Sequence, residues 1–330
     1  MRPLSYTRAS DVESAITLVG GDPGSSFLAG GTTKVDLLRL NVEHTDRLVD
    51  INDLPLTAVD ELADGTIRIG ALARMSDVAR TPIIKERYPA VSEALLLGAS
   101  EQLRNMASIG GNLCQRVRCT YFRDGVSPCN KREPGTGCSA LEGLNRGHAI
   151  LGVTESCIAT HPSDVAVPFV AFDAVVHTAG LDGERTIPID DFYLVPGDTP
   201  QFEHPLAQGE LITAVDLPPF PLAAGSLYLK FRDRQSYEFA LVSICAALTV
   251  KDGAVADVRI ALGGVGTKPW RALRAEQELR GAPVSDESFA RAAAAELSTA
   301  APRPGNAFKV ALAERAIVRG LRHSMDGEAT

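Results

Sequence analysis

Apolar residues recur at helical spacing close to the start of the chain. In the segment DVESAITLV, the side chains of Val12, Ala15, Ile16 and Val19 fall on one face of a 3.6-residue helix. We therefore predict an amphipathic helix that begins near Asp11. The preceding segment, PLSYTRA, predicts a short strand that leads into this helix.

The rest of the first third alternates short strand-like and helix-like segments. SFLAGG is an apolar run that ends in glycines and leads into the helix-like TTKVDLLRL. RLVDIND and TIRIGALA are typical of short strands, with a turn signal at Asp64–Gly65 between the flanking segments. MSDVAR and PAVSEALLLGA predict helices, with Ser76 as an N-cap and Gly98 as a stop.

This periodicity is lost between residues 114 and 157, where Gly, Pro, Cys, Arg and Asn dominate. A loop of this length is uncommon in a compact domain unless it is functional or disordered. Regular patterns return after His161, where VAVPFVAFDAVVHTA predicts a helix followed by a strand. ELITAVDLPPF then predicts a strand that ends at Pro218 and Pro219, and we place a domain boundary there.

The remaining third has strands first and helices afterwards. Two strand-like stretches, LYLKFRDRQSYEFALVSICAALTV and VADVRIALGGVG, flank a turn signal at Asp252–Gly253, and Ala-rich helical segments follow. This order predicts an α+β domain, and the chain shows no solenoid-type repeat.

Composition narrows the class of protein. At 330 residues with 45% hydrophobic residues, the chain is long enough for two or three domains with real cores. It has no long uncharged apolar run and no secretory signal, so we expect no membrane span and no export signal of its own. A formal net charge of −8 argues against a general nucleic-acid binder.

Two glycine-rich segments could hold a phosphate group. LAGGTT, residues 28–33, follows a strand-like run and opens a helix, so its backbone N–H groups could form an anion-binding concavity. SIGGN, residues 108–112, has the same chemistry, and two such turns would suit a diphosphate held from two sides. Neither matches the GxGxxG fingerprint, so a bound dinucleotide would not be held in the Rossmann mode. The alternative is that both are plain strand-to-helix turns, which we also favour for GGVG at 263–266.

Five of the six cysteines lie between residues 114 and 157, with the spacing C-x4-C-x9-C-x8-C-x18-C. Such wide and uneven gaps favour a [4Fe–4S] cluster over a structural zinc site, which more often uses close CxxC-like pairs. Cys114 adjoins the SIGGN segment, so we assign the cluster to Cys119, Cys129, Cys138 and Cys157. Zinc ligation and metal-free thiols remain alternatives, and Cys245 is expected to be a core residue. Nearby basic residues would stabilise the negative cluster: Arg116, Arg118, Arg123, Lys131, Arg132 and Arg146.

Taken together, the ordered motifs resemble a known family. LAGGTT, RNMASIGGN, HPSDVAVPFVAFDA, LKFRDRQSYEFALVS and ALGGVG occur in the order seen in FAD-binding subunits of molybdenum hydroxylases, the xanthine dehydrogenase and aldehyde oxidoreductase family. The cysteine-bearing insertion is similar to that of a [4Fe–4S]-containing subset. This subset comprises the FAD subunit of periplasmic-type aldehyde oxidoreductases and the β subunit of 4-hydroxybenzoyl-CoA reductase.

The resemblance implies an α+β fold in two parts. Residues 1–217 would form a two-lobed FAD-binding domain of the vanillyl-alcohol-oxidase (PCMH) type, with lobes at 1–55 and 56–217 and the iron–sulfur insertion at 114–157. Residues 218–330 would form an α+β C-terminal domain like that of the CO dehydrogenase flavoprotein.

The resemblance also implies the residues of an FAD site. Those expected at the diphosphate are Phe27, Leu28, Ala29, Gly30, Gly31, Thr32, Thr33 and Lys34 from the first lobe, with Ser108, Gly110, Gly111 and Asn112 from the second. Asp164 would lie near the ribityl and diphosphate part, Ile212 close to the flavin, and Lys230 in the FAD site. Tyr237 falls in a segment that approaches the isoalloxazine in some relatives, and it either covers the ring or is an ordinary tyrosine.

The implied function is electron transfer within a heterotrimer. A molybdenum-cofactor large subunit and a [2Fe–2S] small subunit would pass electrons to FAD on this chain and then to an external acceptor. No residue of this chain is expected to act in acid, base or nucleophilic catalysis, and its scattered histidines show no catalytic pairing. The alternatives are a zinc-stapled binding module without redox cofactors and a 4-hydroxybenzoyl-CoA reductase-type β subunit. The compartment would be cytoplasmic, or periplasmic if a signal-bearing partner exports the complex.

Overall fold

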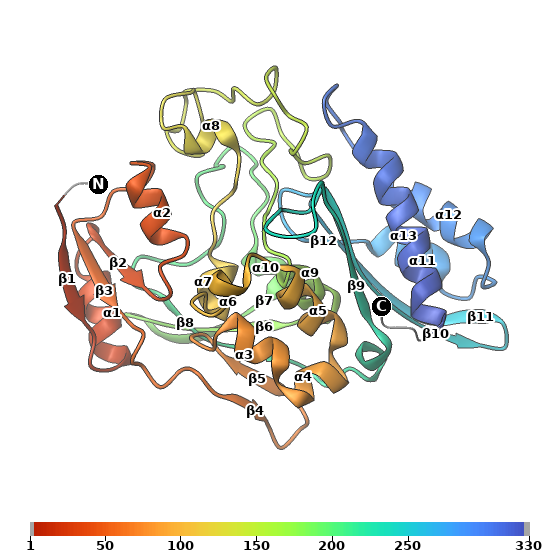
Figure 1. The fold of residues 1–330 in the computed structure, drawn as a ribbon, viewed down its shortest axis with the longest axis horizontal. Coiled ribbons are helices and arrows are strands. Elements are labelled where there is room, and N and C mark those ends of the chain that lie inside the picture. The colour runs from red at the N-terminus through yellow and green to blue at the C-terminus, as the bar shows by residue number, and fades with distance from the viewer. Residues whose placement is uncertain (1–2, 327–330) are drawn as a thin grey trace.

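The computed structural model describes residues 3–326, which build three sheets (Figure 1). The first sheet is parallel, with strand order β1-β3-β2, and consists of β1 (Ser5–Arg8), β2 (Ser25–Leu28) and β3 (Arg47–Asp50). Helix α1 (Val12–Gly20) begins with a capping box between Asp11 and Ser14 and buries the predicted apolar face against this sheet. The strand-then-helix prediction for this segment is confirmed.

The second sheet has five strands in the order β4-β5-β8-β6-β7, all antiparallel to their neighbours. They are β4 (Val59–Glu61), β5 (Ile67–Gly70), β6 (Val175–Gly180), β7 (Gly183–Pro188) and β8 (Leu211–Leu217). Helices α3 (Met75–Arg80), α4 (Pro82–Arg87), α5 (Pro89–Leu97), α6 (Glu101–Arg104), α9 (Ala166–Ala171) and α10 (Ile189–Phe192) belong to the same lobe. The largest hydrophobic core of the molecule combines buried side chains of this sheet with those of α3, α5 and α9.

One predicted helix boundary is wrong and another is confirmed. The N-cap of α3 is Arg74, so Ser76 lies inside the helix and is buried. Arg74 forms a β-bridge with Ser108, and this long-range pairing holds its backbone extended just before the helix. Gly98 does end α5, and its N–H donates to the carbonyl groups of Ala94 and Leu95.

The third sheet belongs to the C-terminal third, in the order β12-β11-β10-β9. Its strands are β9 (Leu227–Phe231), β10 (Val242–Lys251), β11 (Ala254–Gly263) and β12 (Trp270–Arg271), preceded by the 3₁₀ helix η1 (Pro221–Gly225). Helices α11 (Leu273–Leu279), α12 (Asp286–Leu297) and α13 (Phe308–Asp326) follow, as the strands-then-helices pattern predicts. The predicted turn is confirmed, because Asp252 and Gly253 adopt φ values of 53° and 77°. No helix within residues 3–326 is long and apolar enough to cross a membrane.

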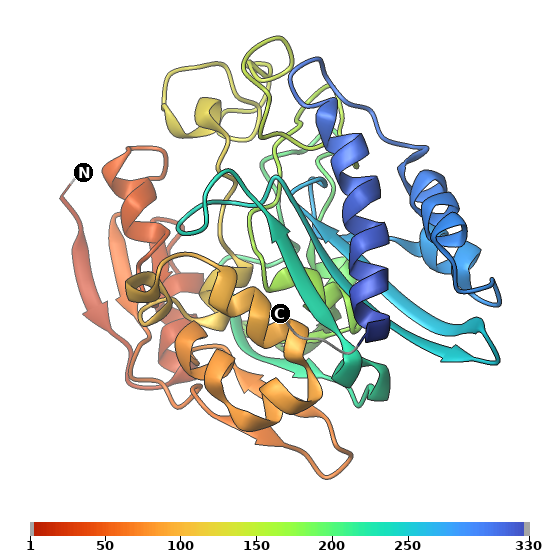
Figure 2. The ribbon, with the colours of Figure 1, turned by 45° about the vertical axis from the view of Figure 1, so that its right-hand side comes forward.

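Strand β10 shows how the sheets are layered. Cys245 and Ala247 point into the core shared with α5 and α9, whereas Ile244 and Ala246 point into the core under α13. This alternation follows the two-residue period of a strand. The third sheet is therefore covered on both faces, with α5 and α9 on one side and α11–α13 on the other (Figures 1 and 2). Cys245 is a fully buried core residue, as expected.

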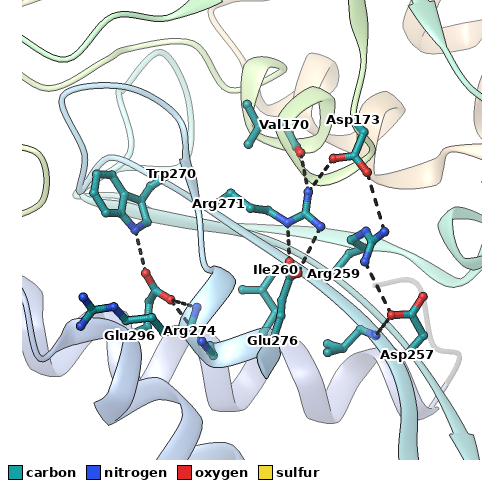
Figure 3. Close-up of polar contacts among 12 residues, drawn as sticks. Val170, Asp173, Asp257, Arg259, Ile260, Trp270, Arg271, Arg274, Glu276 and Glu296 are labelled. Carbon is teal, nitrogen blue, oxygen red and sulfur yellow. Dashed lines mark hydrogen bonds and ion pairs between the residues drawn. The ribbon is translucent and has the colours of Figure 1, made fainter. Parts of the chain in front are cut away.

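A polar network fixes the C-terminal part against the second lobe (Figure 3). Arg271 of β12 donates to the carboxylate of Asp173 at 2.9 Å and to the carbonyl oxygen of Val170 at 3.0 Å, both at the end of α9. The same guanidinium is paired with Glu276, which is fully buried in α11. Because these donors and acceptors are satisfied on both sides, the two parts of the chain meet in one defined orientation.

The segment from 114 to 157 has little regular structure and rises as long loops from one end of the molecule (Figures 1 and 2). Its helix α8 (Thr120–Arg123) is a single turn. Hydrogen bonds from side chains to the backbone hold these loops in place of regular backbone pairing. Arg132 donates to the carbonyl groups of Tyr121 and Phe122 at 2.7 and 2.8 Å. Asn130 accepts from the N–H groups of Gly135 and Gly137. The insertion is thus an ordered loop held by its own polar contacts.

Glu210 ties the loop before β8 to the hairpin of β6 and β7. Its carboxylate accepts from Arg185 at 2.6 and 2.8 Å, from Thr178 at 2.6 Å and from the N–H of Ala207 at 2.9 Å. Burial by itself raises the pKa of Glu210, but the hydrogen bonds from Arg185 and Thr178 outweigh it and lower the pKa to about 2. The group is therefore more acidic in the folded chain than in the unfolded one.

We predict that Glu210→Gln lowers the free energy of unfolding by about 1–3 kcal/mol at pH 7, as expected for hydrogen bonds to a charged group. Because the folded pKa is depressed, this contribution is present above about pH 4.5 and is lost as the pH falls toward 2. Urea unfolding of both proteins at pH 7 and pH 3 measures it. The difference should shrink at pH 3, and the exposed Glu184→Gln serves as control. A difference that stays constant with pH would contradict this role.

Candidate functional site

The first glycine segment links β2 to α2 (Lys34–Arg39). Gly31 adopts a φ of 72°, and its carbonyl accepts from the N–H of Val35 in the first turn of α2. Within residues 3–326, the backbone N–H groups of residues 30–34 donate to no acceptor. Successive free N–H groups beside a helix start form an anion-binding concavity, as predicted from the sequence.

The second segment differs from the prediction. Residues Ile109–Leu113 form the short helix α7, with Ser108 as its N-cap. The N–H groups of Ile109 and Gly110 donate to the carbonyl groups of Ala73 and Ala71, and the N–H of Gly111 donates to the Ser108 hydroxyl. These N–H groups are therefore used inside the protein. A ligand could approach the backbone closely at Gly110 and Gly111, which have no side chains. It could also form hydrogen bonds with the side-chain amide of Asn112.

The two glycine segments lie against each other because Gly30 has no side chain. A Cβ atom at Gly30 would overlap the carbonyl oxygen of Met106 and lie 2.7 Å from its carbonyl carbon. It would also approach the Cα of Ala107 to 3.2 Å. Any larger residue would thus push the first lobe away from the backbone that leads into α7.

Two cavities meet at this contact. The first, of about 400 Å³, is lined by Phe27, by residues 29–34, by Ser108, Gly110 and Gly111, and by Ile212. The second, of about 560 Å³, is lined by Asn112, Asp164, Lys230 and Tyr237 among others. Thr32, Thr33 and Gly111 belong to both. Each cavity is in the size range of a small-molecule site. Because they share three lining residues, one ligand could occupy both.

The structure thus gathers the residues predicted to bind FAD, with one exception and one rearrangement. Leu28 lines neither cavity, and its carbonyl group accepts from Ile51. Ile212, expected close to the flavin, lines the first cavity, whereas Tyr237, expected either to cover the ring or to be an ordinary tyrosine, lines the second. A ligand that runs through both cavities would therefore contact them with opposite ends.

A buried ion pair closes the second cavity. Lys230 donates to Asp164 at 2.8 Å and to the carbonyl group of Leu97 at 3.1 Å, and Tyr228 donates to the other oxygen of Asp164 at 2.6 Å. Burial raises the pKa of Asp164, whereas the Lys230 charge and both hydrogen bonds act in the opposite direction. The pair forms a polar wall that joins β9 to the end of α5.

The four cysteines assigned to a cluster line one small cavity inside the insertion: Cys119, Cys129, Cys138 and Cys157. Cys129 and Cys138 face each other in an isolated β-bridge. Val117 and Phe122 pack with Cys129, Cys157 and Cys119 in a small hydrophobic cluster that is separate from the main cores. Cys114, left out of the predicted set, lines the first cavity and does not line this one.

The sulfur atoms have polar neighbours suited to a thiolate. Burial raises the pKa of Cys119 to about 12, although the N–H groups of Phe122 and Tyr121 favour the anion. Burial likewise raises the pKa of Cys157 to about 11, against the Lys131 charge and the N–H of Ala159. In a metal-free chain these thiols stay protonated at neutral pH, so metal binding must displace their protons.

Within the described residues, no three His, Cys, Asp or Glu side chains converge closely enough to hold a single metal ion. Tetrahedral zinc with Zn–S bonds of about 2.3 Å would bring its sulfur atoms within about 3.8 Å of one another. An iron–sulfur cube separates its thiolates further, because each binds a different iron atom.

A chain of opposite charges connects the glycine segment to the cysteine loop. Lys34 pairs with Glu43 at 2.9 Å, and Glu43 pairs with Arg116 at 3.0 Å. Arg116 also pairs with Glu203, which pairs with Lys131 at 3.1 Å. Burial by itself raises the pKa of Glu203, but Arg116 and Lys131 outweigh it and keep the pKa below its usual range. No local sequence pattern indicates a role for Glu203, because its partners lie far away in the chain.

Two histidines have polar partners that the sequence did not indicate. His177 lies 2.7 Å from Asp216, which also accepts from Arg68. Arg68 and His177 line a separate groove on the five-stranded sheet. His148 places Nε2 3.1 Å from the Sγ of Cys119. Neither of these two histidines lines the first or second cavity, whereas His204 lines the first together with Glu43 and Glu210.

Comparison with known proteins identifies the two parts of the chain. Residues 2–220 match the model of the FAD binding domain in molybdopterin dehydrogenase, and residues 227–324 match the CO dehydrogenase flavoprotein C-terminal domain. The chain is 47% identical to the aldehyde oxidoreductase FAD-binding subunit PaoB of Escherichia coli (strain K12), over 97% of this chain and 98% of that one. It is 28% identical to the putative xanthine dehydrogenase FAD-binding subunit XdhB of the same organism, over 91% and 87%.

A solved structure has the same fold. Carbon monoxide dehydrogenase from Hydrogenophaga pseudoflava, in a form that lacks the Mo-pyranopterin moiety of the molybdenum cofactor, superposes with a TM-score of 0.77. The match covers 99% of both chains at 25% identity. The predicted α+β class, an FAD-binding domain followed by a CO dehydrogenase flavoprotein-type C-terminal domain, is confirmed.

We predict that Gly30→Ala disrupts the contact between the two glycine segments and lowers the flavin content of the purified protein at least tenfold. The added methyl group has no room beside the Met106 carbonyl group. Flavin absorbance per mole of chain measures the effect. Gly225→Ala is the matched control, since a Cβ there meets nothing within 4 Å. A Gly30→Ala protein with full flavin content would show that the contact does not shape the site.

Proposed function

Because the chain belongs to the family of FAD-binding domains in molybdopterin dehydrogenases, and is an oxidoreductase subunit of the aldehyde oxidoreductase/xanthine dehydrogenase family, we propose a role in electron transfer. In this proposal it binds FAD and one [4Fe–4S] cluster and works inside a complex with a molybdenum subunit and a [2Fe–2S] subunit. The observation that carries the FAD part is the pair of cavities that share Thr32, Thr33 and Gly111.

The residues present suit FAD. The free N–H groups of residues 30–34 and the hydroxyl groups of Thr32 and Thr33 would bind the diphosphate at the junction of the cavities. Ile212 and Phe27 give the first cavity apolar walls, and Lys230 and Asp164 give the second a polar one. Bound FAD would supply two-electron chemistry with release of single electrons, so the chain itself positions and shields the cofactor.

The cluster part of the proposal rests on the four cysteines that line one cavity and on the polar groups around them. Lys131 and the N–H groups of Phe122 and Ala159 would stabilise thiolate ligands. Family membership argues against the alternative of a zinc-stapled module without redox cofactors. No feature of the cavities favours a 4-hydroxybenzoyl-CoA reductase-type subunit over an aldehyde oxidoreductase subunit.

An aldehyde as the substrate of the complex is supported by the 47% identity to PaoB, compared with 28% to XdhB. We expect the assembled complex to reduce a dye with aromatic or aliphatic aldehydes and to leave xanthine unoxidised. Steady-state assays with both substrate classes on one preparation make the comparison. Turnover of xanthine alone would overturn the aldehyde assignment and would leave the flavin assignment intact.

We predict that single Cys→Ser changes at positions 119, 129, 138 and 157 each remove most of the cluster, because each deletes one of its thiolate ligands. Iron and acid-labile sulfide per chain, with electron paramagnetic resonance of the reduced protein, measure the loss. Cys114→Ser is the control and should keep its iron, since Cys114 lines the first cavity instead. Retention of iron in all four variants would contradict the ligand set.

His148 would tune such a cluster. Burial and the nearby Lys309 charge lower the pKa of His148 to about 4, so the ring is neutral near pH 7 and can donate one N–H to Cys119. Hydrogen bonds to a ligand sulfur stabilise the more negative, reduced state. We predict a lower midpoint potential for His148→Phe, and a smaller change for His148→Gln, in a potentiometric titration. An unchanged potential in His148→Phe would exclude this hydrogen bond as a determinant.

A further inference from the structure

Two arginines of the insertion form part of the wall of the second cavity. Arg118 and Arg123 line it together with Thr32, Thr33 and Gly111. About three-quarters of each side chain is buried, with exposed fractions of 24% and 22%. Two guanidinium groups therefore lie beside the first glycine segment, although they belong to a part of the chain some 85 residues away.

The positive charges of Arg118 and Arg123 are not fully balanced by negative charges of the protein. Both arginines share one carboxylate, Asp36, which lies 3.5 Å from Arg118 and 2.5 Å from Arg123. Within residues 3–326, the Nε atom of Arg118 and the Nη1 atom of Arg123 are buried and donate to no acceptor. Unsatisfied buried donors are costly, so the protein by itself leaves these two guanidinium groups incompletely hydrogen-bonded.

The position of Arg118 indicates which acceptor that is. Its Nη2 atom lies 3.4 Å from the hydroxyl oxygen of Thr33, which belongs to both cavities. Thr33 itself belongs to the segment whose N–H groups are free, residues 30–34. The guanidinium also stacks over Phe239, at 5.2 Å from the ring centroid, which limits its rotation. The arginine, the threonine and the amide groups thus border a single place for an anion.

We propose that Arg118, supported by Arg123, binds the diphosphate of FAD from the side opposite the first glycine segment, so that the insertion is part of the flavin site. This inference rests on the FAD part of the proposed function and does not require the cluster. A guanidinium can donate two parallel hydrogen bonds to two oxygen atoms of one phosphate. The backbone N–H groups of the first glycine segment can donate to the same diphosphate from the other side.

The other arginines of the insertion do not qualify. Arg132 donates to the carbonyl groups of Tyr121 and Phe122, so it holds the loop. Arg146 is more than half exposed and is paired through both nitrogen atoms with Asp233. Arg116 lines the first cavity instead, and its charge is balanced by two carboxylates, Glu43 and Glu203.

The test measures ligand affinity on the full-length chain after its flavin has been removed. Dissociation constants for FAD, for ADP and for riboflavin are determined with the wild type and with Arg118→Gln, Arg118→Lys and Arg123→Gln. ADP carries the diphosphate without the ring, and riboflavin carries the ring without the diphosphate. Arg146→Gln is the matched control, a surface arginine of the same insertion.

We expect Arg118→Gln to weaken FAD and ADP binding by about ten- to a hundredfold, the range for a lost hydrogen bond between charged groups. Riboflavin binding should change less than twofold. Arg118→Lys should recover part of the loss, because it restores the charge without the fork. Arg123→Gln should have a smaller effect of the same kind, and Arg146→Gln should bind all three ligands as the wild type does.

Two results would overturn the proposal. One is a folded Arg118→Gln protein, with an unchanged thermal midpoint, that binds FAD as tightly as the wild type. The other is an equal loss of FAD and riboflavin affinity, which would assign the arginine to the ring. If Arg118→Gln does not fold, Arg118→Lys decides: wild-type FAD and ADP affinities there would exclude a bidentate contact. A wild-type chain that binds no FAD at all would instead refute the proposed function.

Discussion

The contact between Gly30 and the backbone at Met106 and Ala107 is the constraint on which the functional site depends. It allows the first lobe to reach the second without an intervening side chain, and it places Thr32, Thr33 and Gly111 on a wall common to two cavities. The N–H groups beside it remain free, whereas those of α7 are used within the protein. The first lobe therefore contributes the free backbone hydrogen-bond donors of the site. The second lobe contributes a backbone without side chains that leaves room for a ligand.

Buried charges extend this arrangement into the insertion. The chain of ion pairs from Lys34 through Glu43, Arg116 and Glu203 to Lys131 ends beside the cysteines. Buried ion pairs gain little net stability, because desolvation offsets much of their attraction, but breaking one partner leaves an uncompensated charge. The network therefore fixes where the cysteine loop lies relative to the glycine segment, and the two candidate cofactor sites form one connected unit.

Local signals in the sequence predicted most elements, because each depends on a few adjacent residues. The left-handed turn at Asp252–Gly253, the stop at Gly98 and the cysteines that share one cavity are examples. The errors arose where distant contacts decide. Arg74 caps α3 because it pairs with Ser108, and the N–H groups of α7 are taken by Ala71 and Ala73. The roles of Arg118 and Glu203 could not be predicted from a local motif, because their partners come close to them only in the folded chain.

We propose that this one chain holds both a flavin and an iron–sulfur cluster, and the cofactor content of the purified chain, free of its partner subunits, tests this. We expect about one FAD, with about four irons and four acid-labile sulfides, per chain. A well-folded chain that contains zinc in place of iron, or iron without flavin, would contradict it.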